Sequence, residues 1–390
     1  MTTRFVNEKL RPFGTTIFAE MSALALKTGA VNLGQGFPDT DGPSVVAEAA
    51  IEAIRTGRGN QYPPGPGIPE LRHAIAKHQH DFYGLDVDPD AGVLVTAGAT
   101  EALTAAILAI LDEGDECILF EPFYDSYPAA VAMAGATRVP VTLRAPNFAV
   151  DPDELRAAIT PRTKMIVVNS PHNPTGTVFD RTTLQAIADL AIEHDLLVLS
   201  DEAYEHLTYD SVIHTPIATL PGMFERTITV GSAGKSFSFT GWKVGWATGP
   251  ADLVHTVRMA KQFLTYVSAG PFQYAVAEGF ALGREYFDAF AADLQSKRDR
   301  LAGGLSEAGF EVFLPKGTYF ITTDIRGIGE TDGLAFCRSL PELCGLVAVP
   351  NVVFYDSKEI GRPYVRFAFC KRHEVIDQAI ERLRSISLVR

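Results

Sequence analysis

The chain contains the stretch Thr227-Ile-Thr-Val-Gly-Ser-Ala-Gly-Lys235-Ser-Phe-Ser-Phe-Thr-Gly-Trp-Lys243, in which a β-branched apolar run leads directly into a turn of small residues. The run predicts a buried strand, and Lys235 lies in the turn after it. A lysine that is desolvated there can lose its proton and attack a carbonyl carbon, as Schiff-base lysines do. Taken alone, the stretch also fits a solvent-exposed lysine at a helix start. A P-loop does not fit, because only two residues separate Gly231 from the Gly-Lys pair.

Similar apolar runs recur along the chain before and after this stretch. They cover residues 93–96, 117–120, 165–168, 196–199, 227–230 and 244–247. Segments with apolar residues at spacings of three and four separate them, for example at 100–111, 181–194 and 251–263. This alternation predicts an α/β fold with a mostly parallel sheet.

The C-terminal part has a different pattern. A long helical stretch is predicted over residues 274–308, and it is followed by short strands at 310–313, 319–322 and 365–369 and by a closing helix at 374–383. With 390 residues the chain exceeds the usual size of a single core, so we expect a second, smaller α+β domain.

Composition excludes several classes of function. The formal net charge of −13 disfavours nucleic acid as a partner, since phosphate binding requires a basic face. Neither a signal sequence nor an apolar run of membrane-spanning length is present, which predicts a cytoplasmic protein without membrane contact. The four cysteines form no C-x-x-C pair, so buried free thiols are expected and no metal site is predicted. We expect His73, His78 and His80 to lie on a solvated helix face.

Residues able to bind an anion or a flat ring follow two of the predicted strands. Gly98-Ala99-Thr100 opens a helix after residue 96, where free backbone N–H groups and the helix dipole favour a phosphate. Tyr124 belongs to a cluster of aromatic residues after residue 120 and is suited to stack on a ring, although ordinary packing would also explain it. Ligands of open α/β sheets bind at this edge.

Further polar groups follow the next strands. Asn173 lies in a rigid Asn-Ser-Pro-His-Asn-Pro turn, and Asp201 ends an apolar run, where its charge requires a positive partner such as a pyridinium N–H. Ser232 and Lys243 are near Lys235 in sequence and suit a phosphate dianion. Arg366 lies in an apolar strand and suits a carboxylate, either of a ligand or of the protein. A phosphate, a cationic ring, an acidic oxygen and a carbonyl together describe pyridoxal 5′-phosphate.

These motifs resemble those of pyridoxal-phosphate-dependent aminotransferases of fold type I, class I. The resemblance is strongest to the branch with kynurenine, glutamine-K and methionine aminotransferases and an actinobacterial N-succinyldiaminopimelate aminotransferase. It rests on Asn32-Leu-Gly-Gln-Gly-Phe-Pro-Asp39, Asn60-Gln-Tyr-Pro-Pro-Gly65, Asn169-Ser-Pro-His-Asn-Pro-Thr-Gly176, Ser200-Asp-Glu-Ala-Tyr204, Ser232 to Lys243 and Tyr364-Val-Arg-Phe367. It implies a seven-stranded large domain at 38–284, a small domain at 285–390 and an N-terminal arm at 1–37 that joins the small domain.

The resemblance also implies roles for individual residues. Lys235 would carry the cofactor, Asp201 would pair with the ring nitrogen, and Tyr204 and Asn173 with the 3′ oxygen. The phosphate would be bound by Gly98, Ala99, Thr100, Ser232 and Lys243, with Tyr62 supplied by the second subunit of a homodimer. Tyr124 would stack on the ring. The substrate carboxylate would be bound by Arg366, Asn173 and the backbone of Gly34, and Phe18 and the partner's Tyr266 would line the side-chain pocket.

The implied reaction is ping-pong transfer of an amino group from an L-amino acid to a 2-oxo acid. Candidate substrates are N-succinyl-LL-2,6-diaminopimelate with 2-oxoglutarate, or methionine, glutamine and aromatic amino acids such as kynurenine. The uncharged rings at 18, 124 and 266 favour an apolar pocket, whereas the succinylated substrate would require cations at the mouth, for which Arg11 and Lys261 are candidates.

Three alternatives remain open. A cysteine-S-conjugate β-lyase would use the same cofactor and the same first step. A dinucleotide-dependent oxidoreductase is disfavoured by the absence of a G-x-G-x-x-G motif after the first strand. A catalytically inactive regulator is disfavoured by the complete set of Lys235, Asp201, Tyr204 and Arg366.

Overall fold

The computed structural model describes residues 5–388, and within them the largest sheet has seven strands. These are β2 (Val93–Thr96), β3 (Glu116–Glu121), β4 (Thr137–Thr142), β5 (Thr163–Asn169), β6 (Leu197–Asp201), β7 (Thr227–Ser232) and β8 (Gly245–Thr248), in the order β2-β8-β7-β6-β5-β3-β4. The strands from β3 to β7 are parallel, and β8 is antiparallel to both of its neighbours. The predicted mostly parallel α/β fold is confirmed.

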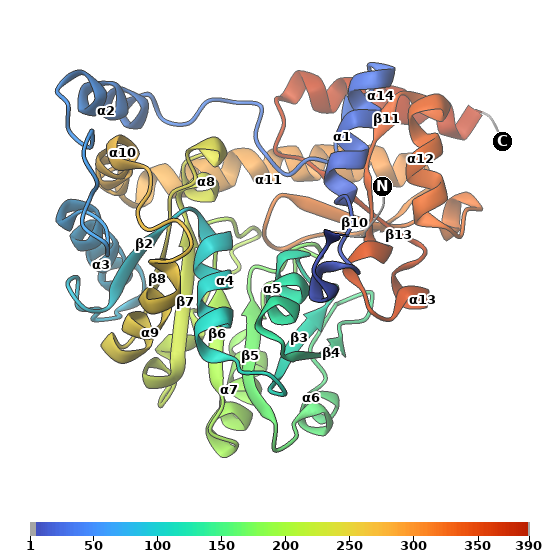
Figure 1. The fold of residues 1–390 in the computed structure, drawn as a ribbon. Helices are drawn as coiled ribbons and strands as arrows, with labels where there is room; N and C mark the ends of the chain where they lie inside the picture. Colours follow the sequence, from blue (N-terminus) through green and yellow to red (C-terminus); the bar gives the residue numbers. More distant parts are fainter. Residues whose placement is uncertain (1–4, 389–390) are drawn as a thin grey trace.

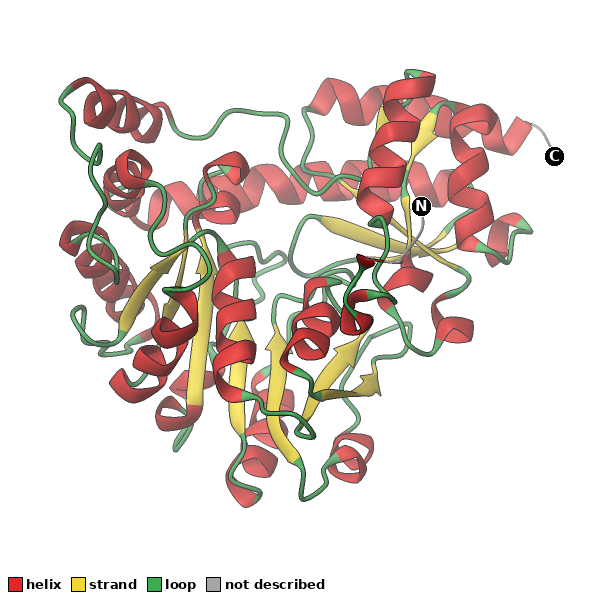
Figure 2. Cartoon of the chain, viewed as in Figure 1, coloured by secondary structure: helices red, strands yellow, loops and turns green. Residues whose placement is uncertain are grey.

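Helices cover both faces of this sheet (Figure 2). On β3, Cys117 and Leu119 pack in one core with α4 (Ala99–Ile110), α5 (Ser126–Ala134) and α9 (Ala251–Lys261). Ile118 and Phe120 alternate with them and pack in another core with α6 (Pro152–Ala158) and α7 (Arg181–Glu193). Because both faces are buried, the central strands are apolar throughout. The edge strand β4 is exposed at its start and contains Pro140, so its pattern did not predict a strand.

A group of helices lies beside the β2 edge of the sheet (Figure 1). It consists of α2 (Ser44–Arg55), α3 (Pro69–Tyr83) and α10 (Gly270–Phe280), and α10 contacts the other two. The predicted single helical stretch at 274–308 is two helices, α10 and α11 (Gly283–Glu307). Gly283 has a φ of 70°, which a right-handed helix does not tolerate, so the chain turns there.

The second sheet has four antiparallel strands within the described chain and lies above the ends of the large sheet (Figure 1). Its order is β12 (Val349–Pro350), β13 (Tyr364–Ala368), β10 (Phe320–Asp324) and β9 (Glu311–Phe313). The N-terminal strand β1 (Val31–Asn32) pairs with β11 (Leu346–Val347). The surrounding helices are α1 (Ile17–Thr28), α12 (Gly333–Cys344), the short α13 (Lys358–Gly361) and α14 (His373–Leu388). The division of the chain at residues 38 and 284 remains a prediction.

One prediction about helix α3 is wrong. His73 and His80 are exposed, as expected, but His78 is only 4% exposed. It lies three residues after Ile75 and seven after Leu71, so it belongs to the buried face of the helix. Its polar character concealed this position in the sequence. The four cysteines are free and buried, as predicted. Among residues 5–388, no helix has the length and apolar character needed to cross a membrane.

Two adjacent glycines of α11 test the packing between the long helix and α14. A Cβ on Gly304 would lie 2.6 Å from Cγ1 of Ile380, whereas a Cβ on Gly303 would meet no atom within 4 Å. We expect Gly304→Ala to lower the free energy of unfolding by roughly 1–3 kcal/mol through overpacking. Gly303→Ala is the matched control and should raise this free energy by up to about 1 kcal/mol through helix propensity. Urea unfolding of both variants measures this, and equal midpoints would contradict the packing described.

Candidate active site

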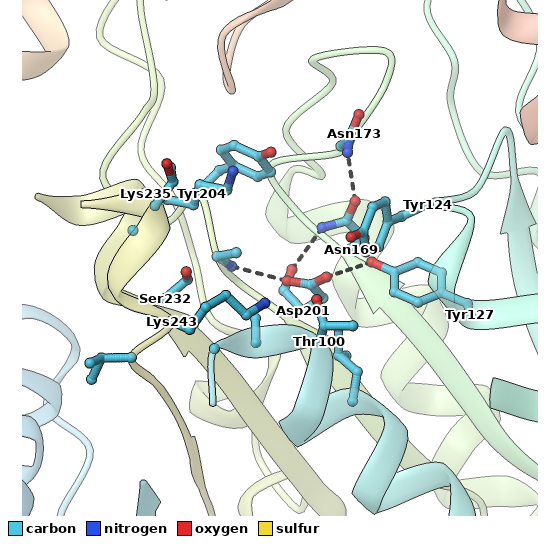
Figure 3. A pocket seen from close by; sticks show the side chains of 17 residues that line it. Thr100, Tyr124, Tyr127, Asn169, Asn173, Asp201, Tyr204, Ser232, Lys235 and Lys243 are labelled. Carbon is cyan, nitrogen blue, oxygen red and sulfur yellow. Dashed lines mark hydrogen bonds between the residues drawn. The ribbon is translucent and has the colours of Figure 1, made fainter. Parts of the chain in front are cut away.

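A cavity lies at the carboxyl ends of β5, β6 and β7 (Figure 3). These strand ends face the smaller sheet (Figure 1). Most of the predicted cofactor residues line it: Gly98, Ala99, Thr100, Tyr124, Asn173, Asp201, Tyr204, Ser232, Lys235 and Lys243. Strand register explains the convergence, since Asn169 and Asp201 are paired on β5 and β6, and β7 places Ser232 next along the same edge. These residues are far apart in sequence and come together because parallel strands end at one edge.

One end of the cavity suits a phosphate. Gly98 has a φ of 76° and caps α4, so the first N–H groups of a twelve-residue helix face the cavity. A Cβ on Gly98 would lie 3.1 Å from Nζ of Lys243, and a Cβ on Gly245 would lie 2.5 Å from the carbonyl carbon of Gly98. Only glycine at both positions allows this close approach of backbone and ammonium group. Helix dipole, N–H donors and Lys243 together provide a binding site for a dianion.

Asp201 lies in the middle of the cavity wall (Figure 3). Its Oδ2 accepts a hydrogen bond of 2.6 Å from the Tyr127 hydroxyl, and its Oδ1 accepts one of 3.1 Å from the Ala203 amide. Asn169 Nδ2 donates to the Asp201 carbonyl at 2.9 Å, which holds the strand end in place. Burial raises the pKa of Asp201 above its ordinary value, although these two hydrogen bonds to the carboxylate oppose the shift.

The Asp201 carboxylate has no cationic partner within ion-pair distance among the described residues. A buried acid of this kind is stabilised when a ligand brings a positive group to it. Tyr127 was not predicted as a site residue. The sequence did place it three residues after Tyr124 in the aromatic segment, but only the fold shows that its hydroxyl reaches Asp201.

Lys235 lies in the short helix α8 (Ala233–Ser236) directly after β7. Its Nζ donates to the Tyr319 hydroxyl at 2.6 Å and to the Gly36 carbonyl at 3.3 Å. The Tyr319 hydroxyl in turn donates to the same carbonyl at 2.5 Å. Burial lowers the pKa of Lys235 to about 8, with a smaller opposing contribution from Asp201. The neutral amine, which is the nucleophile, is therefore accessible near neutral pH.

Tyr319 belongs to the approach to β10 in the smaller sheet, 84 residues after Lys235. No local pattern singles it out in the sequence. Its ring lies 5.2 Å from that of Tyr204, in an edge-to-face arrangement. Burial raises the pKa of both phenols, so both retain their protons at neutral pH.

Arg366 is 1% exposed on β13, and its guanidinium joins three segments of the chain. Nη1 donates to Asn173 Oδ1 at 2.9 Å and Nη2 donates to the Gly34 carbonyl at 3.1 Å. Its Nε has no hydrogen-bond partner among the described residues, and no described carboxylate lies within ion-pair distance. Burial lowers the pKa of Arg366 to about 10. A buried cation without an anion has the character of a carboxylate-binding site.

Aromatic rings surround the Arg366 guanidinium. Its central carbon lies 3.9 Å from the ring centre of Phe320, 5.2 Å from that of Phe18 and 5.4 Å from that of Phe354. Phe18 comes from α1, and its predicted role in the substrate side-chain pocket remains a prediction. A ligand whose carboxylate reaches Arg366 would therefore meet apolar walls.

Tyr62 and Tyr266 lie away from this cavity within the single chain. Their rings contact each other with centres 5.4 Å apart, and they are 81% and 53% exposed. Neither lines the cavity described above.

The prediction that Lys261 supplies a cation at the mouth of the substrate pocket is wrong within the single chain. This lysine is 2% exposed and donates to the carbonyl of Tyr266 at 2.6 Å and to that of Gly65 at 3.5 Å. The ammonium group of Lys261 is occupied by these two carbonyl oxygens. It therefore stabilises the loop that contains Tyr266 and links it to the segment of Gly65. Arg11 is exposed in the N-terminal arm.

The residues of the cavity fit pyridoxal 5′-phosphate. The glycine-lined helix start and Lys243 suit the phosphate, the unpaired Asp201 carboxylate suits a protonated ring nitrogen, and Lys235 suits the aldehyde. Tyr124 stands on the wall of the same cavity.

Comparison with known proteins agrees with this chemistry. The family model for class I and II aminotransferases matches residues 28–383. A probable N-succinyldiaminopimelate aminotransferase of Mycobacterium tuberculosis is 51% identical over 385 residues, which cover 96% of this chain and 97% of the relative. The solved structure of N-succinyldiaminopimelate aminotransferase from this organism matches with a TM-score of 0.95, covering 98% of this chain and all of that chain.

Two further relatives belong to other branches. A methionine aminotransferase of Escherichia coli is 38% identical over 97% of both chains, and a solved Escherichia coli structure with that function has a TM-score of 0.93 over 97% of this chain and 98% of that one. The mouse kynurenine–oxoglutarate transaminase 3 is 39% identical over 99% of this chain and 91% of its own length. These matches exclude the dinucleotide-dependent oxidoreductase and do not favour the β-lyase. The chain belongs to the class I and II aminotransferases and is a pyridoxal-phosphate-dependent transaminase, which moves amino groups between amino acids and 2-oxo acids.

Proposed function

We propose that this enzyme transfers an amino group between N-succinyl-LL-2,6-diaminopimelate and 2-oxoglutarate. The observation that carries the proposal is the 51% identity, over nearly the whole of both chains, with a relative named for this activity. Both substrates have a carboxylate beside the reacting carbon, which suits Arg366. The distal carboxylates of the succinylated substrate require positive charge at the mouth of the substrate pocket. Of the two candidates, Arg11 and Lys261, only Arg11 remains.

A second candidate is a broader enzyme for methionine, glutamine and aromatic amino acids such as kynurenine. The apolar rings of Phe18, Phe320 and Phe354 around Arg366 favour it, since apolar walls discriminate weakly between side chains. The relatives named for methionine and kynurenine share 38–39% identity with the chain, which is less than the 51% shared with the probable N-succinyldiaminopimelate aminotransferase.

The proposed roles of the cavity residues follow from their chemistry. Lys235 holds the cofactor aldehyde, Asp201 the protonated ring nitrogen, and Tyr204 with Asn173 the 3′ oxygen. Gly98, Ala99, Thr100, Ser232 and Lys243 hold the phosphate, and Tyr124 covers the ring face. Arg366, Asn173 and the Gly34 backbone orient the substrate carboxylate, with Phe18 beside its side chain. When bound, pyridoxal phosphate supplies an electron sink for the pair released from the substrate Cα.

The protein residues then control protons and orientation. Arg366 fixes the carboxylate and so directs the Cα–H bond toward Nζ of Lys235, which removes that proton as a general base. The pKa of about 8 suits this task near neutral pH, because the amine can both accept and return a proton. The hydrogen bonds from Tyr127 and the Ala203 amide favour the charged form of Asp201 against the effect of burial, and a charged Asp201 would stabilise a protonated ring nitrogen.

We propose a homodimeric assembly in the cytoplasm, in which Tyr62 and Tyr266 complete the site of the partner subunit. Support comes from a group of exposed apolar side chains on and after α9, comprising Met259, Phe263, Leu264 and Tyr266, beside the exposed Tyr62. Exposed apolar side chains gathered in one short segment favour an interaction site there.

The dimer predicts a concentration-dependent activity. Phe263 is 84% exposed, so Phe263→Asp should leave the fold intact but place a charge in the proposed interface. Light scattering should then detect monomers, and an activity assay should find much lower activity. Ile213→Asp is a control, since Ile213 is 82% exposed in another segment and should remain dimeric. A fully active wild-type monomer would refute the shared site.

The depressed pKa of Lys235 predicts how cofactor loading depends on pH. The neutral amine attacks the aldehyde, so its fraction rises with pH and reaches half at about 8, instead of near the ordinary lysine value of about 10.4. The rate of covalent cofactor incorporation into the cofactor-free enzyme should therefore rise up to about pH 8 and then level off. Stopped-flow absorbance measures this. Borohydride reduction followed by peptide mapping should locate the cofactor on Lys235, and Lys235→Ala should carry none covalently.

Asp201→Asn should retain cofactor but slow the half-reaction. The amide cannot stabilise a pyridinium, and loss of one partner of a buried charge pair costs about 2 kcal/mol or more, so we expect at least a roughly 30-fold lower single-turnover rate. Asp252→Asn, at an exposed aspartate of α9, is the control and should be unchanged. An undiminished rate in Asp201→Asn would remove Asp201 from this role.

A substrate panel decides between the two candidate functions. N-succinyl-LL-2,6-diaminopimelate should give a kcat/KM at least about tenfold above those of methionine, glutamine and kynurenine with 2-oxoglutarate as acceptor, which corresponds to about 1.4 kcal/mol. Arg11→Ala should lower the value for the succinylated donor selectively. Lys261→Ala should affect all donors alike, because it loosens the loop without removing a substrate contact. Equal constants for apolar donors would favour the second candidate.

A further inference from the structure

A buried cluster of His78, Glu205 and His206 lies outside the proposed cofactor cavity. His78 comes from α3, whereas Glu205 and His206 directly follow Tyr204 in the segment after β6. One ligand atom from each of the three residues lies within 4.8 Å of the other two. Nε2 of His78 and Nε2 of His206 are 2.8 Å apart. Two imidazoles and a carboxylate, contributed by two segments of the chain, therefore lie close enough together to bind one ion.

The polar atoms of this cluster are incompletely satisfied by the protein. The two Nε2 atoms can share one proton, but Nδ1 of His78 is buried and has no partner among the described residues. The Tyr83 hydroxyl donates to Oε2 of Glu205 at 2.7 Å, and within the described chain Oε1 receives no hydrogen bond. Buried polar side chains are usually fully bonded, so a group of this kind requires an explanation.

Aromatic packing holds both imidazoles in place. The His206 ring stacks on Phe287 of α11 with centres 3.6 Å apart, and the His78 ring stacks on Phe82 at 4.6 Å. The contact between the two Nε2 atoms is a hydrogen bond, so at least one of them carries no proton and can accept. An unprotonated imidazole nitrogen is the form in which histidine binds metals. Packing of both rings against aromatic side chains preorganises them as donors.

The cluster is reached from the surface through His78, and its surroundings carry both signs of charge. His78 forms part of the wall of a surface cavity together with Phe82, Phe280 and Arg284. Arg284 lies over the Phe82 ring at 4.3 Å, and its positive charge opposes a cation. Asp81 on α3 contributes negative charge, although it pairs with Lys77, which lines the same cavity. The buried Glu202 beside Glu205 contributes negative charge as well, and it pairs with His214.

We propose that His78, Glu205 and His206 form a binding site for one divalent transition-metal ion of the Zn²⁺ type. Two imidazole nitrogens and one carboxylate oxygen are a ligand set that Zn²⁺ takes in proteins, with water in the fourth position. Nitrogen donors disfavour Mg²⁺ and Ca²⁺, which prefer oxygen ligands. The ion links α3 to the segment that carries Asp201 and Tyr204. This link stabilises the wall of the proposed cofactor cavity on the side away from the cofactor.

The test uses the holoenzyme, stripped with a chelator and then exposed to Zn²⁺ or Co²⁺. After gel filtration, metal analysis should find about one ion per chain in the wild type, and titration calorimetry should show at least a tenfold weaker affinity in His78→Gln and His206→Gln. His73→Gln is the matched control, since His73 is exposed on the same helix and should bind as the wild type does. The cofactor absorbance band of each variant shows that it remains folded.

Each outcome decides the proposal. Co²⁺ at the site should give a visible d–d spectrum of the wild type that is absent from both ligand variants, and Zn²⁺ should raise the thermal midpoint of the wild type alone. Wild-type holoenzyme that retains no metal would refute the site whatever the variants do. Metal retained equally by His78→Gln and His206→Gln would refute it as well, because the ion would then be bound elsewhere, for example at the cofactor. In either case the cluster is a neutral hydrogen-bonded histidine pair.

Discussion

Parallel strands that end side by side at one edge are the constraint on which the rest of this structure depends. The register of β5, β6 and β7 places Asn169, Asp201 and Ser232 at adjacent strand ends, although they are far apart in sequence. Such register requires both faces of the sheet to be buried by helices, because alternate side chains of each strand belong to different cores. The cofactor chemistry is therefore a consequence of how the apolar strands pack.

The smaller sheet closes this edge and changes the chemistry of the groups there. Tyr319 and the Gly36 carbonyl bind Nζ of Lys235 from the side opposite the large sheet. Their packing leaves the lysine only partly exposed, and this desolvation lowers its pKa to about 8. Arg366 is buried in the same way, and its bonds to Asn173 and Gly34 join the two sheets and the N-terminal segment. Removal from water thus prepares both cations for ligands.

The segment after β6 connects two polar clusters through the same few residues. Asp201 and Tyr204 face the cofactor cavity, whereas Glu205 and His206 turn toward α3. Glu202 also turns away, and its carboxylate pairs with His214 and accepts a hydrogen bond from Ser200. Every one of these groups is partly or fully buried, so each must find a partner in the protein or in a ligand. The density of such groups makes this segment sensitive to what binds on either side.

Local sequence was sufficient to predict the alternation of strands and helices, because strand and helix periodicity are properties of neighbouring residues. It was also sufficient to predict the strand-end groups that gather in the cavity, since strand order and edge are shared by all open α/β sheets. It did not predict Tyr319 or Tyr127 as partners of Lys235 and Asp201, the burial of His78, or the bonds that bind Lys261 to backbone carbonyls. Those depend on contacts between residues from 5 to 196 positions apart in sequence, which only the packing of the folded chain brings together. Residue type and spacing determine which chemistry is available to this protein, and tertiary structure decides which groups lose water and therefore which of them are reactive.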